Sequence, residues 1–441
     1  MSPRLAVVLM LLSSAPLVAQ TREEKVQRDR EKVTAEGFWI YNDLPRGFAA
    51  AKETGKPLLV VLRCIPCEEC VKLDDELIDR DPVIRPLLEQ FVCVRQVSTN
   101  GLDLGLFQYD TDQSFAVFML NADGTIYGRF GTRSHRTDWL FDVSLPGLAR
   151  ALEGALELHR GYPANRGQLV GKRGEPLEFA SPEKYPSLKD KYTDSLATTG
   201  SVVKSCIHCH QIGDAQRDYY RAAGKPIPEQ LLFPYPHPKS LGLILDPEER
   251  AVVKSVDADS VAAKTGFQPG DQIVLFGGQP PLSIADIQWV LHRMPAEGGT
   301  VPVQMKRGDG RLVTVSLILE PGWRRRGDIS WRVTTWGYRR MVTGGLKLEP
   351  AEADLRSELK LPSERMALRV EYVGKFGAHA AAKNAGVQLD DVVVSVDGKT
   401  DLMTETDLFV YGLESKRPGD TLDLVVRRGG KELQLAIPIQ K

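Results

Sequence analysis

Two short stretches of this 441-residue sequence hold the side chains that could do redox or metal chemistry. In one of them, Cys206 and Cys209 are followed at once by His210, which gives the order C-x-x-C-H. That order is the signature for covalent attachment of a c-type haem, in which both sulfurs form thioethers and the histidine binds the iron. A plain disulfide and a zinc site are the alternatives, although adjacent Cys and His strain one tetrahedral zinc site. We therefore predict one covalent haem c in a short segment, residues 195–237.

A haem bound through His210 has a second axial position, which another side chain can fill or which can stay open. The nearest histidine outside the motif is His237, in FPYPHPKS, so His210 and His237 are the candidate metal ligands. The thioether alternatives to His237 are Met294, Met305 and Met341. Because the segment is too short for a whole cytochrome c fold, its haem would need cover from neighbouring domains.

The other reactive stretch carries three cysteines at a regular spacing of three: Cys64, Cys67 and Cys70. Three thiols so spaced are difficult to pack as incidental core residues, which favours a chemical role. Disulfide exchange is one option, and a site for copper or an iron–sulfur cluster is another. The bacterial ferredoxin pattern would need a fourth cysteine followed by proline, and this stretch does not continue in that way.

The elements around these cysteines follow one another in an informative order. The run LLVVLR at 58–63 predicts a buried strand before the cysteines, and the spacing at 71–78 predicts a helix after them. The same reasoning predicts a helix ending at Gly55, a strand at 91–98, a hairpin at 115–131 turning at 122–124, and a helix at 145–159. This order resembles the thioredoxin fold over residues 36–160.

The resemblance to thioredoxins implies a role for each cysteine. With LLVVLR aligned on the strand before the active site, Cys67 and Cys70 occupy the C-x-x-C position and Cys64 lies in the turn. A helix N-terminus favours a thiolate, so Cys67 is the expected nucleophile and Cys70 the resolving thiol. Thioredoxins carry a cis-proline opposite this pair; Phe115 occupies that place here, so a trans bond and an altered substrate groove are expected. Cys93, in mid-strand, is expected to be a core thiol.

The N-terminus has the pattern of an export signal. Arg4 precedes an apolar run from Leu5 to Leu12, and small residues follow at Ala15 to Ala19. The run is far shorter than the roughly 20 residues of a membrane-spanning helix, and no later stretch is apolar enough to span a bilayer. We therefore assign residues 1–19 to a signal peptide and expect a periplasmic or secreted protein, in a compartment that supports haem attachment and disulfides.

Composition and charge limit the other classes of function. At roughly 100 to 200 residues a domain, 441 residues predict about three domains. A formal net charge of -1, with both signs interspersed, gives no electrostatic footprint for nucleic acid or anionic lipid, and both are excluded as partners. Residues 161–194, rich in Pro, Gly, Lys and Glu, are expected to form a linker that lies against the next domain. Thr21 to Ala35 is expected to form a charged, solvated helical lead-in.

The C-terminal half contains an internal repeat. The stretch 262–278 matches 382–398, with Gly266 on Gly386, Gln268 on Gln388, Asp271 on Asp391 and Gly278 on Gly398. Both stretches resemble the core of bacterial PDZ domains, although Asp390 replaces a glycine in the second. The resemblance implies two PDZ domains, at 238–320 and 342–440.

The PDZ resemblance implies peptide binding. In that family a short loop presents backbone N–H groups to the terminal carboxylate of a peptide, which adds as a strand to the sheet edge. The matching residues here are Leu241, Gly242 and Leu243 in the first domain, and Gly345 and Leu346 in the second. PDZ folds that only pack against each other or against the haem are the alternative.

Residues 321–341, between the PDZ domains, interleave three tryptophans with six arginines. In this Trp/Arg-rich linker we predict inter-domain packing with cation-π contacts, or cover for a haem edge, in preference to nucleic-acid binding. The chain has no G-x-S-x-G motif and no plausible catalytic triad, so proteolysis is not expected, although PDZ domains of this kind often follow exported serine proteases.

The predicted fold class is therefore multi-domain, α/β plus mainly-β, and the chain resembles exported bacterial proteins that join a thioredoxin-like domain, a c-type haem motif and two PDZ domains. One function that follows is thiol-disulfide oxidoreduction, with Cys67 and Cys70 acting on a protein partner and the haem passing single electrons to a redox partner docked through PDZ. The other is a non-catalytic PDZ adaptor, or a metal-binding protein, with structural or sensory cysteines and haem.

Overall fold

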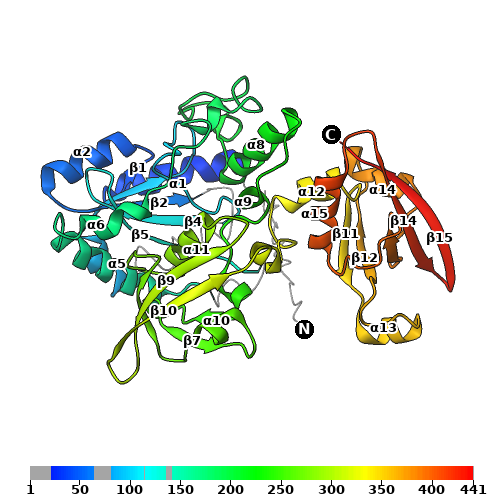
Figure 1. The fold of residues 1–441 in the computed structure, drawn as a ribbon. Helices are drawn as coiled ribbons and strands as arrows, with labels where there is room; N and C mark the ends of the chain where they lie inside the picture. Colours follow the sequence, from blue (N-terminus) through cyan, green and yellow to red (C-terminus); the bar gives the residue numbers. More distant parts are fainter. Residues whose placement is uncertain (1–20, 64–80, 114, 136–141, 441) are drawn as a thin grey trace, which may run out of the picture.

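The computed structural model describes residues 21–63, 81–113, 115–135 and 142–440. The expected signal peptide lies outside the described residues, as do Cys64, Cys67 and Cys70 and the peptide bond between Ser114 and Phe115. Within the described part, a thioredoxin-like sheet and the first PDZ unit pack together, and the second PDZ unit lies to one side (Figure 1).

The first unit is built on a five-stranded sheet with the order β1-β3-β2-β4-β5. Its strands are β1 Ile40–Tyr41, β2 Leu58–Arg63, β3 Val92–Gln96, β4 Phe115–Leu120 and β5 Ile126–Phe130. Strand β3 runs parallel to β1 and β2, whereas β4 and β5 are antiparallel and form the predicted hairpin. The carboxyl ends of β2 and β3 therefore meet at one edge of the sheet.

Helices cover both faces of this sheet: α2 Leu44–Thr54, α4 Ile84–Leu88 and α5 Leu145–Arg160. Successive side chains of a strand point to opposite faces, and β2 accordingly contributes to two cores. Leu59 and Val61 pack with α4 and α5, whereas Val60 and its alternate neighbours pack on the other face. The continuous apolar run of β2 thus reflects burial on both faces, as the sequence predicted.

The charged N-terminal helix is not the solvated lead-in that we expected. Helix α1 (Arg22–Glu36) buries Val26 and Val33. Its Asp29 Oδ1 accepts a hydrogen bond from Arg63 Nη2 at 2.5 Å, and Glu23 accepts the backbone N–H groups of residues 202 and 203 at 2.9 and 3.0 Å. The charges of α1 therefore serve as specific partners for the end of β2 and for a later helix, which a helix's own sequence does not reveal.

Residues 161–194 lie against the units on both sides and form short helices of their own. They contain α6 Arg166–Leu169, η3 Val170–Lys172 and η4 Pro182–Lys184. Tyr185 and Lys172 are fully buried. The Lys172 carbonyl accepts a hydrogen bond from Arg129 Nη2 at 2.6 Å, and its Nζ lies 3.0 Å from Asp286 Oδ1. Polar groups of this segment therefore contact both neighbouring units.

The first PDZ unit follows with two small sheets, β6-β7 and β10-β9-β8. Its elements are η5 Pro238–Leu241, β6 Leu243–Leu245, β7 Val253–Val256, α10 Val261–Thr265, β8 Gln272–Phe276, α11 Ile284–Arg293, β9 Gly299–Lys306 and β10 Leu312–Leu319. Helix α11 lies against β5 of the first unit, where Ser283 Oγ donates to the Arg129 carbonyl at 2.6 Å.

The second PDZ unit is a five-stranded antiparallel sheet in the order β11-β12-β13-β14-β15. Its elements are β11 Leu346–Pro350, α13 Ala353–Glu358, β12 Leu368–Val373, η7 Gly377–Ala380, α14 Ala381–Asn384, β13 Val392–Val396, α15 Glu405–Ser415, β14 Thr421–Arg428 and β15 Lys431–Pro438. Strand β11 lies at one edge of this sheet, so one side of it is open to side chains or to an added strand.

The internal repeat is confirmed by equivalent contacts in the two PDZ units. Asp271 is buried, accepts the N–H of Gln268 at 2.8 Å and pairs with Arg307 at 2.5 Å. Asp391 is also buried, accepts the N–H of Gln388 at 2.9 Å and pairs with Arg428 at 2.6 Å. Each aspartate fixes the turn before a strand. Asp390, where the first unit has a glycine, adopts a left-handed φ of 64°.

The Trp/Arg-rich linker packs as predicted, with cation-π contacts. It forms η6 Trp323–Arg326 and α12 Thr335–Met341. Three guanidinium groups lie over indole rings at 4.8 to 4.9 Å from the ring centroids: Arg324 over Trp323, Arg332 over Trp331 and Arg339 over Trp336. Arg332 also crosses to the first unit, where its Nη1 donates to Asp110 Oδ1 at 2.7 Å. The segment thus ties the units together.

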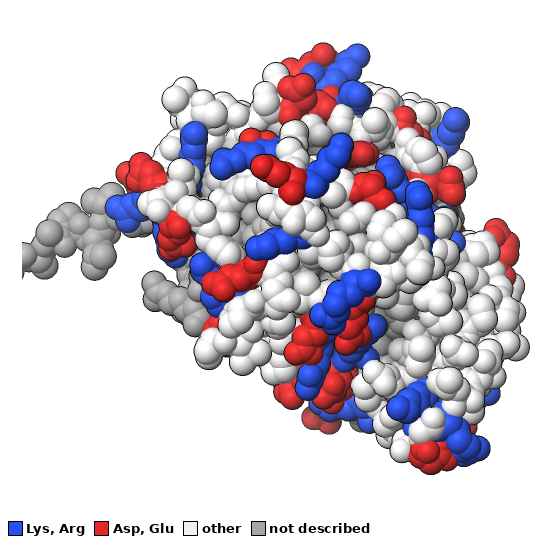
Figure 2. All heavy atoms as spheres, turned by 90° about the vertical axis from the view of Figure 1, so that its left-hand side faces the viewer, with Lys and Arg blue, Asp and Glu red and all other residues white. Residues whose placement is uncertain are grey.

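The charge distribution agrees with the small net charge. On the face shown in Figure 2, lysines and arginines alternate with aspartates and glutamates. None of the described helices is both long enough and apolar enough to cross a membrane.

We expect His292, on α11, to make folding stability pH-dependent. Its ring stacks on Tyr235 at 4.0 Å between centroids, and burial, reinforced by the cationic Arg324 and Arg332, lowers its pKa to about 3. Between pH 6.5 and 3 the unfolded state binds a proton that the folded state does not, so the free energy of unfolding falls on acidification by up to about 1.4 kcal/mol per pH unit.

Chemical denaturation at several pH values tests this expectation. The variant His292→Gln should show a shallower decline than the wild type below pH 6.5, whereas His135→Gln should not. Equal slopes for wild type and His292→Gln would contradict it.

Candidate functional site

The C-x-x-C-H motif is docked on the carboxyl end of β3. It begins directly after α7 (Val202–Ser205) and ends in the first turn of α8 (Cys209–Ala222), and α9 (Glu229–Leu232) follows. Thr99, three residues beyond β3, donates its backbone N–H and its Oγ1 to the Ile207 carbonyl at 3.2 and 2.8 Å. The segment that we predicted as a haem-binding unit is thus an extension of the thioredoxin-like domain.

Asn100 holds the motif from both sides. Its Oδ1 accepts the N–H of Ile207 at 2.8 Å, and its Nδ2 donates to the carbonyls of Ser205 and Thr193 at 3.0 and 2.8 Å. The side chain is buried, so each of these bonds replaces one that water cannot supply. One amide therefore sets the position of the residues on either side of Cys206.

The motif lies at the same edge of the sheet as the carboxyl end of β2. A small cavity of about 10 Å³ is lined by Leu62 and Arg63 at the end of β2, by residues 96–99 at the end of β3, and by Ile207, His208 and Cys209. Cys64 follows Arg63 in the sequence. The structure thus brings the motif next to the end of β2, which sequence spacing did not indicate.

The cysteines of the described chain have different environments. Cys206 is buried, and its Sγ points to the Val97 carbonyl at 3.8 Å. Burial raises the pKa of the Cys206 thiol to about 11. Cys209, the first residue of α8, is partly exposed. Cys93 is buried and its Sγ donates to the Leu88 carbonyl at 3.4 Å, which confirms the predicted core thiol.

The imidazole of His210 is partly exposed, and a neighbouring carboxylate holds its orientation. Its side chain is 43% exposed, and Nδ1 lies 3.4 Å from Asp214 Oδ2, one turn further along α8. Burial acts against ionisation of Asp214, but hydrogen bonds from His210 and Arg217 outweigh it and lower the pKa of that carboxyl. A carboxylate at Nδ1 holds the proton there and leaves Nε2 for a metal, an arrangement common among metal-ligating histidines.

The residues of the motif fit a haem in part. His210 offers an exposed, oriented imidazole, and Cys209 beside it is partly exposed. The neighbouring ring of His208 is parallel to that of His210, at 6.0 Å between centroids. Cys206, by contrast, faces the β3 edge, so its sulfur has to turn away from Val97 before it can form a thioether.

The other candidate axial ligands lie elsewhere. His237 lines a cavity of about 560 Å³ to which no residue of the motif contributes. Met305 and Met341 are buried in the cores of the two PDZ units, and Met294 packs against the first of them. The structure therefore does not place His210 and His237 in a common cavity. Among the described residues, no three His, Cys, Asp or Glu side chains converge as metal ligands.

The residues predicted to bind a peptide in the first PDZ unit lie at the end of η5 and the start of β6. Gly242 has a φ of 74°, and a Cβ there would lie 2.3 Å from Ser260 Cβ, so only glycine fits. Leu241 and Leu243 are buried in the core of the unit. The first eight residues of α11 are all buried, partly by the thioredoxin-like domain and by η3, whose Gly171 carbonyl accepts from Trp289 Nε1 at 2.9 Å.

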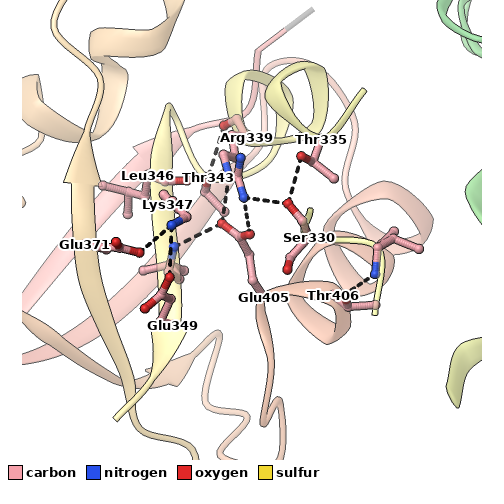
Figure 3. A network of polar contacts seen from close by, with 12 residues as sticks. Ser330, Thr335, Arg339, Thr343, Leu346, Lys347, Glu349, Glu371, Glu405 and Thr406 are labelled. Atoms are coloured by element: carbon pink, nitrogen blue, oxygen red, sulfur yellow. Dashed lines mark hydrogen bonds and ion pairs between the residues drawn. The ribbon is translucent and has the colours of Figure 1, made fainter. Parts of the chain in front are cut away.

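The second PDZ unit has its edge strand occupied by its own side chains (Figure 3). Glu405 Oε1, from the start of α15, accepts the N–H of Leu348 at 3.0 Å. Thr343 Oγ1 donates to the Leu346 carbonyl at 3.0 Å, and the N–H of Gly345 donates to the Arg339 carbonyl at 2.8 Å. These are backbone groups of the loop and edge strand that an added peptide strand would use.

A buried ion pair holds this arrangement. Arg339 Nε and Nη2 donate to the two oxygens of Glu405 at 2.9 and 2.6 Å, and both side chains are at most 2% exposed. Tyr338, the neighbour of Arg339 on α12, packs on Phe409 of α15 at 5.7 Å between ring centroids. Helix α12 therefore covers the space between β11 and α15.

We expect Glu405→Ala to destabilise the second PDZ unit by about 3–5 kcal/mol, because it leaves the Arg339 charge buried without its partner. The matched control is Glu414→Ala on the same helix, where an exposed pair with Arg325 at 2.7 Å contributes less than about 1 kcal/mol. Denaturant unfolding measures both, and amide exchange should show faster exchange at Leu348 in Glu405→Ala alone. Equal losses for the two variants would refute the assignment.

We also expect Asn100 to control the reactivity of Cys206. In protein made without haem attachment, a pKa of about 11 leaves roughly 0.1% of Cys206 as thiolate at pH 8, so its alkylation is slow. Asn100→Ala removes the hydrogen bonds to Ser205 and Ile207, the two neighbours of Cys206, and should raise the rate by about tenfold or more. Mass spectrometry after iodoacetamide treatment gives the rate, with Asn121→Ala in the hairpin turn as control. An unchanged rate in Asn100→Ala would show that other contacts hold the motif.

Several residues of this region had no signal in the sequence. Asn100, Asp214, Arg339 and Glu405 matter through partners that are distant in the chain or one helical turn away. Only Asp214 has a local cue, since it lies four residues after His210 and so on the same side of a helix.

Comparison with known proteins agrees with the units described. A family model described as thioredoxin-like matches residues 39–122, and a PDZ domain model matches residues 239–319 and 366–439. The chain thus contains a thioredoxin-like domain and two PDZ domains.

Solved structures of the HtrA-type protease AlgW are among those similar to this chain. One, a variant with a decapeptide, shares 21% identity over 22% of this chain and 28% of that chain, with a TM-score of 0.20. Another, with a decapeptide, shares 15% identity over 32% of this chain and 49% of that chain, with a TM-score of 0.18. The chain therefore spans less than half the length of these structures.

Proposed function

We propose that this protein is an exported thiol-disulfide redox and electron-transfer protein. In this proposal Cys67 and Cys70, with Cys64 beside them, exchange electrons with a protein partner, and a haem c on Cys206, Cys209 and His210 carries single electrons. The observation that supports it best is the shared edge of the sheet, where His208 and Cys209 meet Arg63, the residue before Cys64. Export rests on the signal pattern at residues 1–19.

The contacts of the motif support a redox role for it in particular. Asp214 Oδ2 lies 3.4 Å from Nδ1 of His210, so that Nε2 is the ring nitrogen left for a metal, and Asn100 fixes the backbone before α8. When bound, a haem would supply one-electron transfer through its iron. A pair of thiols gives up two electrons and two protons as it forms a disulfide, so coupling to one haem takes two successive transfers, with a one-electron acceptor protein between them.

The alternative function, a peptide-binding PDZ adaptor, has less support. The N–H of Leu348 and the carbonyl of Leu346 already have hydrogen-bond partners within the chain. In the first unit, α11 is buried against the thioredoxin-like domain. These contacts favour a mainly structural role for both PDZ domains, with partner docking as a secondary role that needs Arg339 and Glu405 to move.

The first experiment is a pyridine haemochrome spectrum of the full chain, exported from a host with c-type haem maturation. We expect a c-type band that Cys206→Ala/Cys209→Ala loses. Reduction of an insulin disulfide, supported by a dithiol reductant, is the second readout, and Cys67→Ser/Cys70→Ser should abolish it while keeping the haem band.

The two readouts separate the two parts of the proposal. A wild type without covalent haem would overturn the electron-transfer part. A wild type that reduces insulin no faster than Cys67→Ser/Cys70→Ser would overturn the thiol part.

A further inference from the structure

The first PDZ unit has an open sheet edge that the proposed function does not use. Strand β10 (Leu312–Leu319) is the last strand in the order β10-β9-β8 and pairs with β9. Within the described chain, no other backbone hydrogen bond reaches this strand. Helix α10 contacts β10 and contributes Ala262 to the core that holds Leu317 and Leu319. The outer edge of β10 therefore offers unpaired backbone groups.

The hairpin between β9 and β10 fixes which backbone groups point to this edge. The N–H of Arg307 donates to the Arg311 carbonyl at 2.9 Å, so Arg311 and every second residue after it bond to β9. The N–H and C=O groups of the alternate residues point away from β9, and these residues are Leu312, Thr314, Ser316 and Ile318. The side chains of all four are exposed, Leu312 to 62% and Ile318 to 61%.

Strand β10 lacks the features that protect most edge strands from pairing. Its sequence, LVTVSLIL, contains no charged residue, no proline and no glycine. Natural edge strands carry charges, prolines or bulges, because an exposed, uncharged edge strand pairs readily with another strand. The composition of β10 is therefore that of a strand with a partner on both sides.

The internal repeat supplies a comparison within the same chain. In the second PDZ unit, β15 is the equivalent edge strand and pairs with β14. Its exposed residues at the equivalent positions are Glu432, Gln434, Ala436 and Pro438. Glu432 is charged and Pro438 has no N–H, so the edge of β15 is protected. The fold of the unit thus does not require the apolar side chains that β10 exposes.

The order of residues in β10 fits a second copy of the same strand. When two copies run antiparallel about a two-fold axis through Val315, Leu312 lies opposite Ile318 of the second copy, and Thr314 lies opposite Ser316 of the second copy. The N–H and C=O groups of these four residues are the ones that point to the open edge. The register therefore forms hydrogen-bonded pairs along the whole strand and places apolar side chains against apolar ones.

The charges at the two ends of β10 agree with the same register. Arg311 precedes the strand and Glu320 follows it, and both are exposed. In the antiparallel pair, Arg311 of each copy comes next to Glu320 of the other, and opposite charges attract at both ends. Parallel pairing would bring like charges together instead.

We propose that this protein forms a two-fold dimer in which the β10 strands of two copies pair edge to edge and join their sheets into one. Two strands of this length make a contact smaller than the roughly 800 Å² per partner of a standard interface. We therefore expect a dissociation constant in the micromolar range, on the order of 1 to 100 μM.

Sedimentation velocity of the full chain over a range of concentrations tests the proposal, with a reductant present so that intermolecular disulfides do not contribute. We expect a monomer–dimer equilibrium. The variant Thr314→Lys/Ser316→Lys places lysine opposite lysine twice and should raise the dissociation constant at least about tenfold. Gln434→Lys/Ala436→Lys, at the equivalent positions of β15, should leave it unchanged. Thermal melting checks that both variants fold.

Amide exchange of the wild type measures the register independently of any variant. The N–H groups of Leu312, Thr314, Ser316 and Ile318 should exchange at least about tenfold more slowly at concentrations where the dimer dominates than where the monomer dominates. Those of residues 432, 434 and 436 should exchange at the same rate in both.

Three results would each overturn the proposal. They are a wild type that stays monomeric, which would leave the edge to a strand of another protein, a lysine variant of β10 that dimerises as well as the wild type, and exchange at the four β10 residues that does not depend on concentration. None of these measurements depends on thiol or haem chemistry, so their failure leaves the proposed redox function untouched.

Discussion

The arrangement of the first two units depends on the burial of one carboxylate. Asp286, on α11 of the first PDZ unit, is 3% exposed and therefore needs partners within the protein. It accepts the N–H of Arg129 in β5 at 3.2 Å and that of Leu282 at 2.9 Å, and it pairs with Lys172 at 3.0 Å. Because breaking a buried pair leaves an uncompensated charge, this cluster resists separation of the thioredoxin-like domain, the segment 161–194 and the PDZ unit.

The same principle recurs where the second PDZ unit joins the rest. Arg332 pairs with Asp110 and Asp112 of the thioredoxin-like domain, and Arg339 pairs with Glu405 of the second PDZ unit. All five side chains are almost fully buried. The Trp/Arg-rich linker is thus an adaptor between units, with tryptophan rings covering its guanidinium groups. Burial of charge gives these junctions one defined geometry, because each guanidinium must face its carboxylate.

Because of this packing, other parts of the chain cover the carboxyl ends of two strands, β3 and β5, at one edge of the thioredoxin-like sheet. At the end of β3, Asn100 and Thr99 hold the C-x-x-C-H motif. After β5, Arg133 and Ser134 line the cavity that contains His237, together with the approach to the first PDZ unit and the linker. The segments that follow β3 and β5 therefore lie along the same edge of one sheet.

The sequence by itself determined the units and most of their elements. The apolar run at 58–63, the turn at 122–124 and the repeat around Asp271 and Asp391 are local patterns, and each adopts the predicted structure because local periodicity and turn chemistry decide it. The tertiary structure alone decided where the motifs lie relative to one another. Four features depend on contacts between residues far apart in the chain. The C-x-x-C-H motif meets β2 and β3, and His237 lines another cavity. Residues 161–194 contact both neighbouring units, and Glu405 occupies the edge of β11. Such contacts depend on which buried polar groups meet when whole units pack together. The spacing of residues along the sequence does not predict those pairings.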